Sequence, residues 1–305
     1  ISRDILDGIH AYRARYPLPE RLRPRVPHPH YHYYGREIWE AAAAALLCGR
    51  NLLLAGSKAT GKNVLAENLS MAFDRPAWNV SFHVNMDAAS LIGMDTFTGG
   101  EVTFRPGPVY LCAQSGGFGI LDEINMAKNE ALAVLHATLD YRRAIDVPGY
   151  DRVEVDEAAR FIGTMNYGYA GTRELNEALA SRFVVIDMPT ITAEGLVKLL
   201  RREFPELKSA WAEQLAGLFQ DIQRKCDGGE LSTKPLDLRG LLASVRLMRA
   251  GLEGNREYMS LLEQDAQLQI REDSIVNAVE RARRQLRENP AARQQYSQDI
   301  LQLES

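Results

Sequence analysis

The stretch NLLLAGSKATGKN, residues 51–63, decides the predicted fold of this chain. It begins with an apolar run, residues 51–55, that is typical of a buried strand, and a helical pattern follows Lys62. Between them Gly56, Gly61 and Lys62 form the pattern G-x-x-x-x-G-K. Glycines let backbone amides approach an anion closely, and the helix N-terminus and the lysine add positive charge. The stretch therefore predicts a phosphate-binding loop, and a glycine-rich turn without a ligand is the alternative.

The residues expected to contact the nucleotide lie in this loop and in the first turn of the helix. They are Gly56, Lys58, Ala59, Thr60, Gly61, Lys62, Asn63 and Val64. Asn63 stands where such loops usually have a Ser or Thr hydroxyl that binds Mg²⁺. An amide oxygen is still a hard donor, so Asn63 is a candidate Mg²⁺ ligand, directly or through water. The exchange favours weaker metal binding or slower turnover.

Two acidic residues follow a second apolar run in GFGILDEIN, residues 117–125. Residues 118–121 predict a buried strand whose end projects Asp122 and Glu123 toward the phosphates, because parallel sheets bind ligands at the carboxyl ends of their strands. We expect this strand to be the sheet neighbour of the strand at 51–55. Asp122 is the predicted Mg²⁺ partner, through water, and Glu123 is the predicted base. A helix start with acidic first-turn residues is the alternative.

Two further residues complete the predicted site. Asn166 follows the predicted strand at 160–164, so its amide could position water or contact the outermost phosphate, although an Asn at a strand end is usually a turn residue. Arg182 directly precedes the apolar strand 183–186. At that rim its planar charge could reach a phosphate bound to an adjacent subunit. A surface ion pair with Glu177 or Asp187 is the alternative for Arg182.

Composition excludes several classes of protein. The 305 residues, 46% of them hydrophobic, suffice for one large core or two domains, and the net charge of −4 argues against a general nucleic-acid binder. Cys48, Cys112 and Cys226 are too few and too scattered for a disulfide framework or a zinc site. The longest apolar stretch, residues 38–47, is too short to span a bilayer. No leader-like segment is visible, although the chain starts at Ile1 without Met, and we expect a cytoplasmic protein.

The pattern of elements predicts three parts. Residues 1–35 form a short amphipathic helix and an extended Pro- and Arg-rich arm, in which three alternating histidines without a Cys or carboxylate partner favour no metal site. In residues 36–190 helices and strands alternate, which predicts a parallel sheet flanked by helices. Residues 191–305 predict a smaller, all-helical domain. The expected elements of the middle part are helices at 38–48, 63–73 and 128–141, strands at 51–55, 78–84, 118–121, 160–164 and 183–187, and hairpins within 91–108 and 144–155.

The ordered set GSKATGKN, ILDE, TMN, ASRF and PLDLRGL resembles the AAA+ ATPase superfamily of P-loop NTPases, with its Walker A and Walker B motifs. The stretch FRPGP, residues 104–108, ahead of the acidic pair is similar to the MoxR branch. The likeness covers the chain from Tyr34 to about Gly251. Asn63 departs from the family pattern, and so do Asp237 and Leu238, where MoxR proteins usually have a Ser-Pro pair.

This resemblance implies an ATPase that binds ATP and Mg²⁺ between the subunits of a ring of six. It implies that Asn166 is the first sensor, Arg182 the arginine finger acting across the ring, and Arg239 the sensor arginine of the helical lid. Tyr34 and Gly35 fall where the family holds adenine. MoxR-like proteins commonly act with a von Willebrand factor A domain partner to mature or activate another protein complex, and hairpins in related ATPases project toward a central pore or a partner.

Two other functions fit the same motifs. One is a GTP-dependent nucleic-acid motor of the restriction type, which salt-sensitive DNA binding and a preference for GTP would favour. The other is a nucleotide-gated assembly scaffold with little turnover, and Asn63 is the residue that favours it. A neighbouring gene encoding the D-x-S-x-S adhesion signature would support the MoxR interpretation, and restriction-nuclease neighbours would weaken it.

Overall fold

The computed structural model of the chain describes residues 1–147, 149–167, 174–227, 238, 240–242 and 245–246. The chain divides into two compact units, Ile1–Leu236 and Asp237–Ser305, and the first contains every strand found in the described residues. In that unit the last strand ends at Asp187, and the helices α9 (Ala193–Glu203) and α10 (Ser209–Asp227) follow it. The domain boundary expected near residue 190 stays a prediction.

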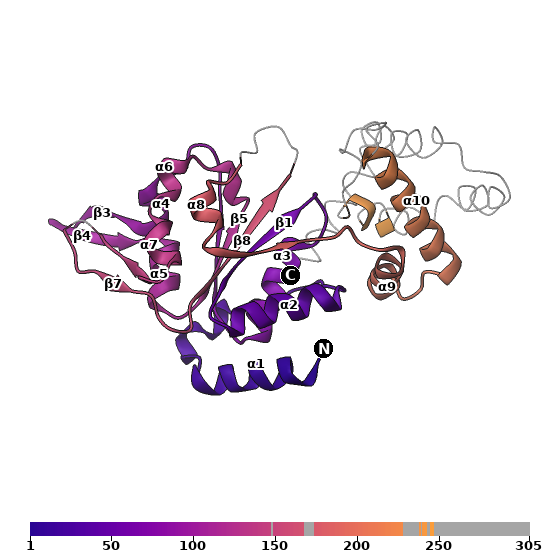
Figure 1. Ribbon diagram of the computed structural model, residues 1–305, viewed down its shortest axis with the longest axis horizontal. Coiled ribbons are helices and arrows are strands. Elements are labelled where there is room, and N and C mark those ends of the chain that lie inside the picture. The colour runs from indigo at the N-terminus through magenta and orange to yellow at the C-terminus, as the bar shows by residue number, and fades with distance from the viewer. Residues whose placement is uncertain (148, 168–173, 228–237, 239, 243–244, 247–305) are drawn as a thin grey trace. The chain divides into compact units, whose positions relative to one another are not determined.

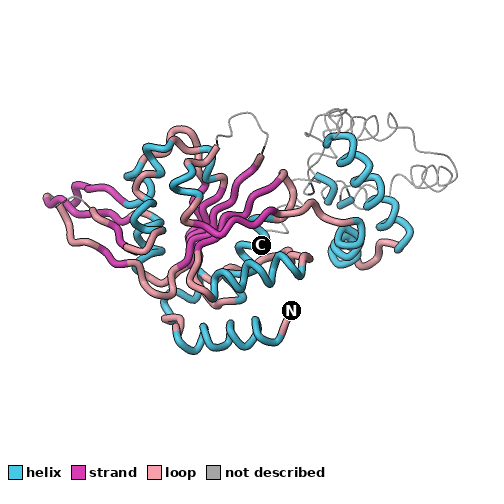
Figure 2. The backbone as a smooth tube through the Cα atoms, viewed as in Figure 1, coloured by secondary structure: helices cyan, strands magenta, loops and turns pink. Residues whose placement is uncertain are grey.

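Five parallel strands form the central sheet (Figure 2). They are β1 (Asn51–Gly56), β2 (Ala77–Ser81), β5 (Phe118–Asp122), β8 (Arg160–Asn166) and β9 (Phe183–Asp187). Their order in space is β2-β5-β8-β1-β9. The predicted parallel α/β sheet is confirmed, although β2 ends three residues earlier than the expected strand at 78–84.

The expectation that β5 is the neighbour of β1 is wrong, because β8 lies between them. The register places Asn166 of β8 beside Gly56 of β1, and Gly163 of β8 beside Leu121 of β5. Long crossovers join parallel strands and allow either neighbour, so the order along the chain does not determine the order in the sheet. The consequence is that the strand carrying Asn166 separates the glycine loop from the acidic pair.

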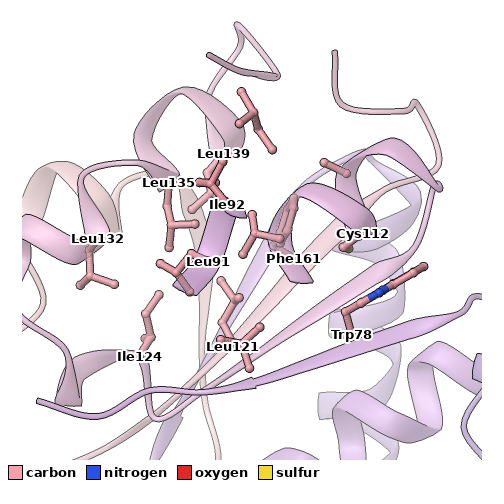
Figure 3. Close-up of a cluster of buried hydrophobic side chains, with 14 of the residues drawn as sticks. Trp78, Leu91, Ile92, Cys112, Leu121, Ile124, Leu132, Leu135, Leu139 and Phe161 are labelled. Atoms are coloured by element: carbon pink, nitrogen blue, oxygen red, sulfur yellow. The ribbon is translucent and has the colours of Figure 1, made fainter. Parts of the chain in front are cut away.

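Helices cover both faces of the sheet, as Figure 1 shows. Leu52 and Leu54 of β1 belong to a buried cluster with α1 (Arg3–Arg15), α2 (Arg36–Leu47) and α3 (Lys62–Ala72). Leu53 belongs to the opposite cluster, in which Leu121 and Phe161 of the sheet face helical side chains (Figure 3). The helices of that face are α4 (Ala88–Ile92), α5 (Pro108–Gln114), α6 (Asn129–Leu132) and α7 (Leu135–Leu139). Burial on both faces explains why the inner strands β1 and β5 are nearly continuous apolar runs, whereas the outer strands β2 and β9 include exposed positions.

Two expected elements differ in detail. The helix predicted for residues 128–141 is divided into α6 and α7, because the amide of His136 bonds the carbonyl of Ala133 three residues earlier and the regular helical ladder stops there. The arm predicted to be extended contains a short 3-10 helix, Glu20–Arg25, with Pro24 inside it. Its length of 6 residues agrees with the expectation that prolines prevent a long helix.

Both predicted hairpins are present. β3 (Gly93–Thr98) pairs with β4 (Glu101–Pro106) around Gly99 and Gly100, and β6 (Ala144–Ile145) pairs with β7 (Val153–Glu154). The hairpins contact one another, since the hydroxyl of Tyr150 donates to Asp95 Oδ1 at 2.6 Å and its ring packs on Phe104. Within the part of the chain that the structure describes, no helix is long and apolar enough to cross a membrane.

Candidate nucleotide site

The loop after β1 is built around the buried side chain of Lys62, the first residue of α3. Its ammonium donates to the carbonyls of Gly56 and Ser57, at 3.1 and 2.6 Å, and to Thr60 Oγ1 at 3.1 Å. Gly61, with φ of 82°, supplies the left-handed turn into the helix. The loop therefore holds a lysine charge and the N-terminus of an 11-residue helix at one place, which suits an anion.

Burial lowers the pKa of Lys62 to about 8, while the nearby carboxylates of Asp122 and Glu123 act in the opposite direction. The lysine and the acidic pair are therefore close enough to interact, although Lys62 begins α3 and the two acids stand at the end of β5. A buried ammonium that is stabilised only partly by its neighbours favours the approach of a further anion.

Thr164 in β8 links the two acidic residues. Its hydroxyl donates to Asp122 Oδ1 at 2.6 Å and accepts a hydrogen bond from the amide of Glu123 at 3.1 Å. Thr164 is 1% exposed, so both bonds are shielded from water. The hydroxyl fixes one carboxylate oxygen of Asp122 and leaves the other free to accept from a water or a metal. Strand alternation places Thr164 and Asn166 on the same face of β8, a sequence signal that could have identified Thr164.

Glu123 and Asn166 are in direct contact. Asn166 Nδ2 donates to Glu123 Oε1 at 2.9 Å, and the backbone of Glu123 is left-handed, with φ of 53°. A non-glycine residue in that region is strained, and such strain occurs often at functional sites. The structure therefore brings together the predicted base and the predicted water-positioning amide.

The residues of this site fit a nucleotide and Mg²⁺. Lys62 and the start of α3 offer positive charge to phosphates, and Asp122 and Asn63 offer the oxygen donors that Mg²⁺ prefers. Asn63 is exposed in the first turn of α3. Among the described residues no cluster of three or more His, Cys, Asp or Glu could hold a metal alone. A Mg²⁺ ion bound mainly through phosphates and water needs no such cluster.

Comparison with known proteins gives the family of this chain. Residues 51–183 match the AAA domain family, dynein-related subfamily. The uncharacterized protein YojN of Bacillus subtilis is 33% identical over 252 residues, which cover 81% of this chain and 83% of that protein. An uncharacterized protein of Staphylococcus aureus is 32% identical over 260 residues, 82% of this chain and 97% of that one. This chain belongs to the AAA+ superfamily.

Among solved structures, the AAA+ chain is similar to the crystal structure of a "putative ATPase" from Cytophaga hutchinsonii. The TM-score is 0.46 and the sequence identity 15%, with 72% of this chain and 64% of that chain covered.

The arm before α2 contacts the phosphate loop of the AAA+ domain at Gly61. A Cβ on Gly61 would lie 3.2 Å from the ring of Tyr33, and the amide of Tyr33 donates to Asn68 Oδ1 at 3.3 Å. Asn68 also donates to the carbonyl of Tyr31 at 2.9 Å. The predicted base-binding residues Tyr34 and Gly35 follow directly, Tyr34 being 38% exposed and Gly35 capping α2. Sequence reasoning missed Tyr33 and Asn68, the residues that contact and hold the loop side of the arm.

Arg182 lies at the other edge of the AAA+ sheet. Phe183, the next residue, pairs with Asn51 at the start of β1, whereas the phosphate loop begins at the far end of that strand. The guanidinium donates to the carbonyl of His136 at 3.2 Å, to the carbonyl of Ala178 and to Asp140 Oδ2 at 3.5 Å. The ion pair is therefore with Asp140, and not with Glu177 or Asp187 as in the alternative interpretation.

The other predicted residues differ in how far the structure places them. Lys58, Ala59, Thr60 and Val64 lie in the loop and helix start as expected, and Ala59 is left-handed with φ of 63°. Arg239 falls outside the described residues. His30 of the arm shares a hydrogen bond with Glu203 Oε2 at 3.2 Å, so a carboxylate does accompany the histidines.

Proposed function

We propose that this AAA+ protein binds ATP with Mg²⁺ and hydrolyses it. The observation that carries the proposal is the Glu123–Asn166 hydrogen bond at 2.9 Å, because an AAA+ domain that only bound nucleotide would not need a carboxylate base paired with a water-positioning amide. Lys62 supports it, since its buried charge lies beside both acids.

Each residue has a separate task in this proposal. Lys62 and the loop amides bind the phosphates, and Asp122 and Asn63 hold Mg²⁺, which neutralises phosphate charge when bound. Glu123 accepts a proton from the attacking water, and Asn166 orients the Glu123 carboxylate and this water. Tyr34 and Gly35 lie beside the adenine of the nucleotide. Apart from this proton transfer, the protein contributes positioning and charge stabilisation.

The experiment is a steady-state ATPase assay of the wild type beside Glu123→Gln. We expect Glu123→Gln to bind ATP with nearly unchanged affinity and to hydrolyse it about 10²- to 10⁴-fold more slowly, the contribution usual for a general base. Glu154→Gln, the same change at an exposed position of β7, is the matched control. Equal, near-zero rates for wild type and Glu123→Gln would reject hydrolysis and leave the scaffold with little turnover.

We further propose that the active form is a cytoplasmic ring of six in which Arg182 reaches the nucleotide of the adjacent subunit and Arg239 couples the phosphate state to the helical part. The position of Arg182 supports action between copies. β1 separates Arg182 from its own phosphate loop by about 16 Å at the usual rise per residue, which is more than one side chain spans. Sedimentation of Glu123→Gln with and without ATP tests assembly, and a species that stays monomeric with ATP would contradict it.

The role that we propose is MoxR-like remodelling or activation of a partner protein complex, with a von Willebrand factor A domain protein as the helper. The β3–β4 hairpin supports contact with a protein client. Phe97 and Val102 are paired near its tip and are 75% and 63% exposed. Phe97→Ala should abolish stimulation of ATP hydrolysis by the partner while leaving the basal rate unchanged. Salt-sensitive DNA binding with a GTP preference would instead favour the nucleic-acid motor.

A further inference from the structure

A pocket of about 300 Å³ opens at the edge of the sheet opposite the phosphate loop. Its wall includes Arg50 and Asn51 at the start of β1, Asp140 and Arg143 from the segment after α7, and Arg182 before β9. Three arginines therefore surround one cavity, with a single carboxylate among the lining residues. The excess of positive charge suits an anion.

Two hydrogen bonds of Asn51 hold the frame of this pocket together. Asn51 is 4% exposed, and its side chain donates to the carbonyl of Leu139 at 3.2 Å and accepts from the amide of Phe161 at 2.9 Å. The first bond ties the start of β1 to the end of α7, and the second ties it to β8. Arg50, which precedes Asn51, is therefore held at a defined place on this edge.

The three arginines are not equivalent. Arg143 donates to the carbonyls of Asp156 and Ala159, at 2.7 and 3.3 Å, and so has a structural role. Arg182 is held by two carbonyls and by Asp140. Arg50 is exposed, and within the described ranges of the chain its guanidinium has no hydrogen-bond or ion-pair partner.

The single carboxylate does not neutralise the pocket. Asp140 receives hydrogen bonds from Arg142 to both of its oxygens, at 3.1 and 2.7 Å, and this pairing lowers the pKa of Asp140 to about 2. Most of its charge is therefore satisfied from outside the cavity. Arg50 keeps its full charge for a ligand.

We propose that Arg50 is a second arginine that contacts the outer phosphates of a nucleotide held by a neighbouring copy of this chain, beside Arg182. The inference rests on the proposed function, because it needs a nucleotide at the neighbour's phosphate loop. The pocket lies too far from its own loop to serve it, so the phosphate comes from another molecule. The planar guanidinium binds two phosphate oxygens at once, which a lysine does not.

The experiment compares Arg50→Ala with the wild type in ATP binding, ATP hydrolysis and ATP-driven assembly. We expect Arg50→Ala to bind ATP within about twofold of the wild type and to hydrolyse it at least about tenfold more slowly, a smaller loss than the 10³-fold or more usual for a primary finger. Arg50→Lys should recover only part of the rate. Arg3→Ala, which removes a 93% exposed arginine of α1, should match the wild type.

Mixing variants shows whether the contact is made between copies. Lys62→Ala keeps Arg50 in the pocket but loses the lysine that binds phosphate in its own loop. Arg50→Ala keeps that lysine but loses the arginine of the pocket. We expect a mixture of the two to hydrolyse ATP faster than the sum of the separate proteins. A wild-type rate in Arg50→Ala overturns the inference. It is also overturned if mixing Arg182→Ala with Lys62→Ala restores hydrolysis while mixing Arg50→Ala with Lys62→Ala does not.

Two outcomes separate this inference from its alternatives. If the wild type does not hydrolyse ATP, the proposed function fails, and ATP-driven assembly then tests the inference about Arg50. In the presence of ATP, Arg50→Ala should need a higher protein concentration than the wild type to self-associate. Unchanged assembly overturns the inference. Inorganic phosphate is the second probe. Suppose that phosphate raises the Tm of monomeric Lys62→Ala, that this rise depends on Arg50, and that Arg50→Ala hydrolyses ATP normally. The pocket then binds free phosphate and the inference is wrong.

Discussion

Asn166 Nδ2 donates a hydrogen bond to Glu123 Oε1 at 2.9 Å, across the boundary between β8 and the end of β5. The bond occupies one oxygen of the proposed base. A carboxylate held in this way has a fixed direction, and a water bound at the other oxygen would be aligned with it.

We therefore predict that Asn166→Ala slows ATP hydrolysis about 10- to 100-fold without weakening ATP binding, because Glu123 loses its orienting donor. The measurement is kcat from steady-state assays together with Kd from calorimetry. Tyr167→Phe is the control, since the Tyr167 hydroxyl bonds Asp187 instead. An unchanged kcat in Asn166→Ala would contradict the role.

Thr164→Val should raise the Mg²⁺ concentration needed for half-maximal hydrolysis. The change removes the donor to Asp122 Oδ1 and leaves the amide of Glu123 without its acceptor, in a place shielded from water. We expect a several-fold shift, and Thr164→Ser should restore the wild-type value because it keeps the hydroxyl. If Thr164→Ser behaved like Thr164→Val, the loss would be due to packing.

ATP affinity should depend on pH through Lys62. Its pKa in the free protein is about 8, and bound phosphate charge raises that pKa. The complex therefore holds more protons than the free protein above about pH 8, so affinity is complete below this pH and falls as pH rises, by up to tenfold per unit. Calorimetry between about pH 7 and 9.5 measures it, and Lys62→Arg, which does not titrate there, should show no such slope.

Asn51→Ala should lower the free energy of unfolding by about 2 kcal/mol, since the buried carbonyl of Leu139 and amide of Phe161 both lose their partner. Urea denaturation followed by circular dichroism gives the value. Asn79→Ala, at an exposed position of β2, should change stability by less than about 0.5 kcal/mol. Equal effects of the two substitutions would show that the bridge made by Asn51 contributes nothing.

The phosphate loop and the acidic pair could be recognised in the sequence because their chemistry needs local order. Gly56, Gly61 and Lys62 act through a single turn of backbone, and Asp122 and Glu123 stand at the end of one apolar run. The hairpin at Gly99 and Gly100 was predictable for the same reason, since the turn is set by neighbouring residues.

What could not be predicted depends on contacts between distant segments. β8 lies between β1 and β5 because of the path of the crossovers, and only that order brings Thr164 to Asp122. The ion pair of Arg182 with Asp140 joins residues 42 positions apart, so no local pattern announced it. Asn68 is similar, since a helix interior rarely reveals that its amide holds a separate arm.

The hold of Asn68 on residues 31–33 has a practical consequence for work with this protein. The arm is the only covalent link between α1 and the rest of the described chain, and Tyr33 ends it against Gly61. Removing the first 33 residues, or fusing a bulky tag close to them, would take the aromatic side chain of Tyr33 away from the edge of the phosphate loop. The nucleotide affinity measured with a shortened protein would then differ from that of the full chain.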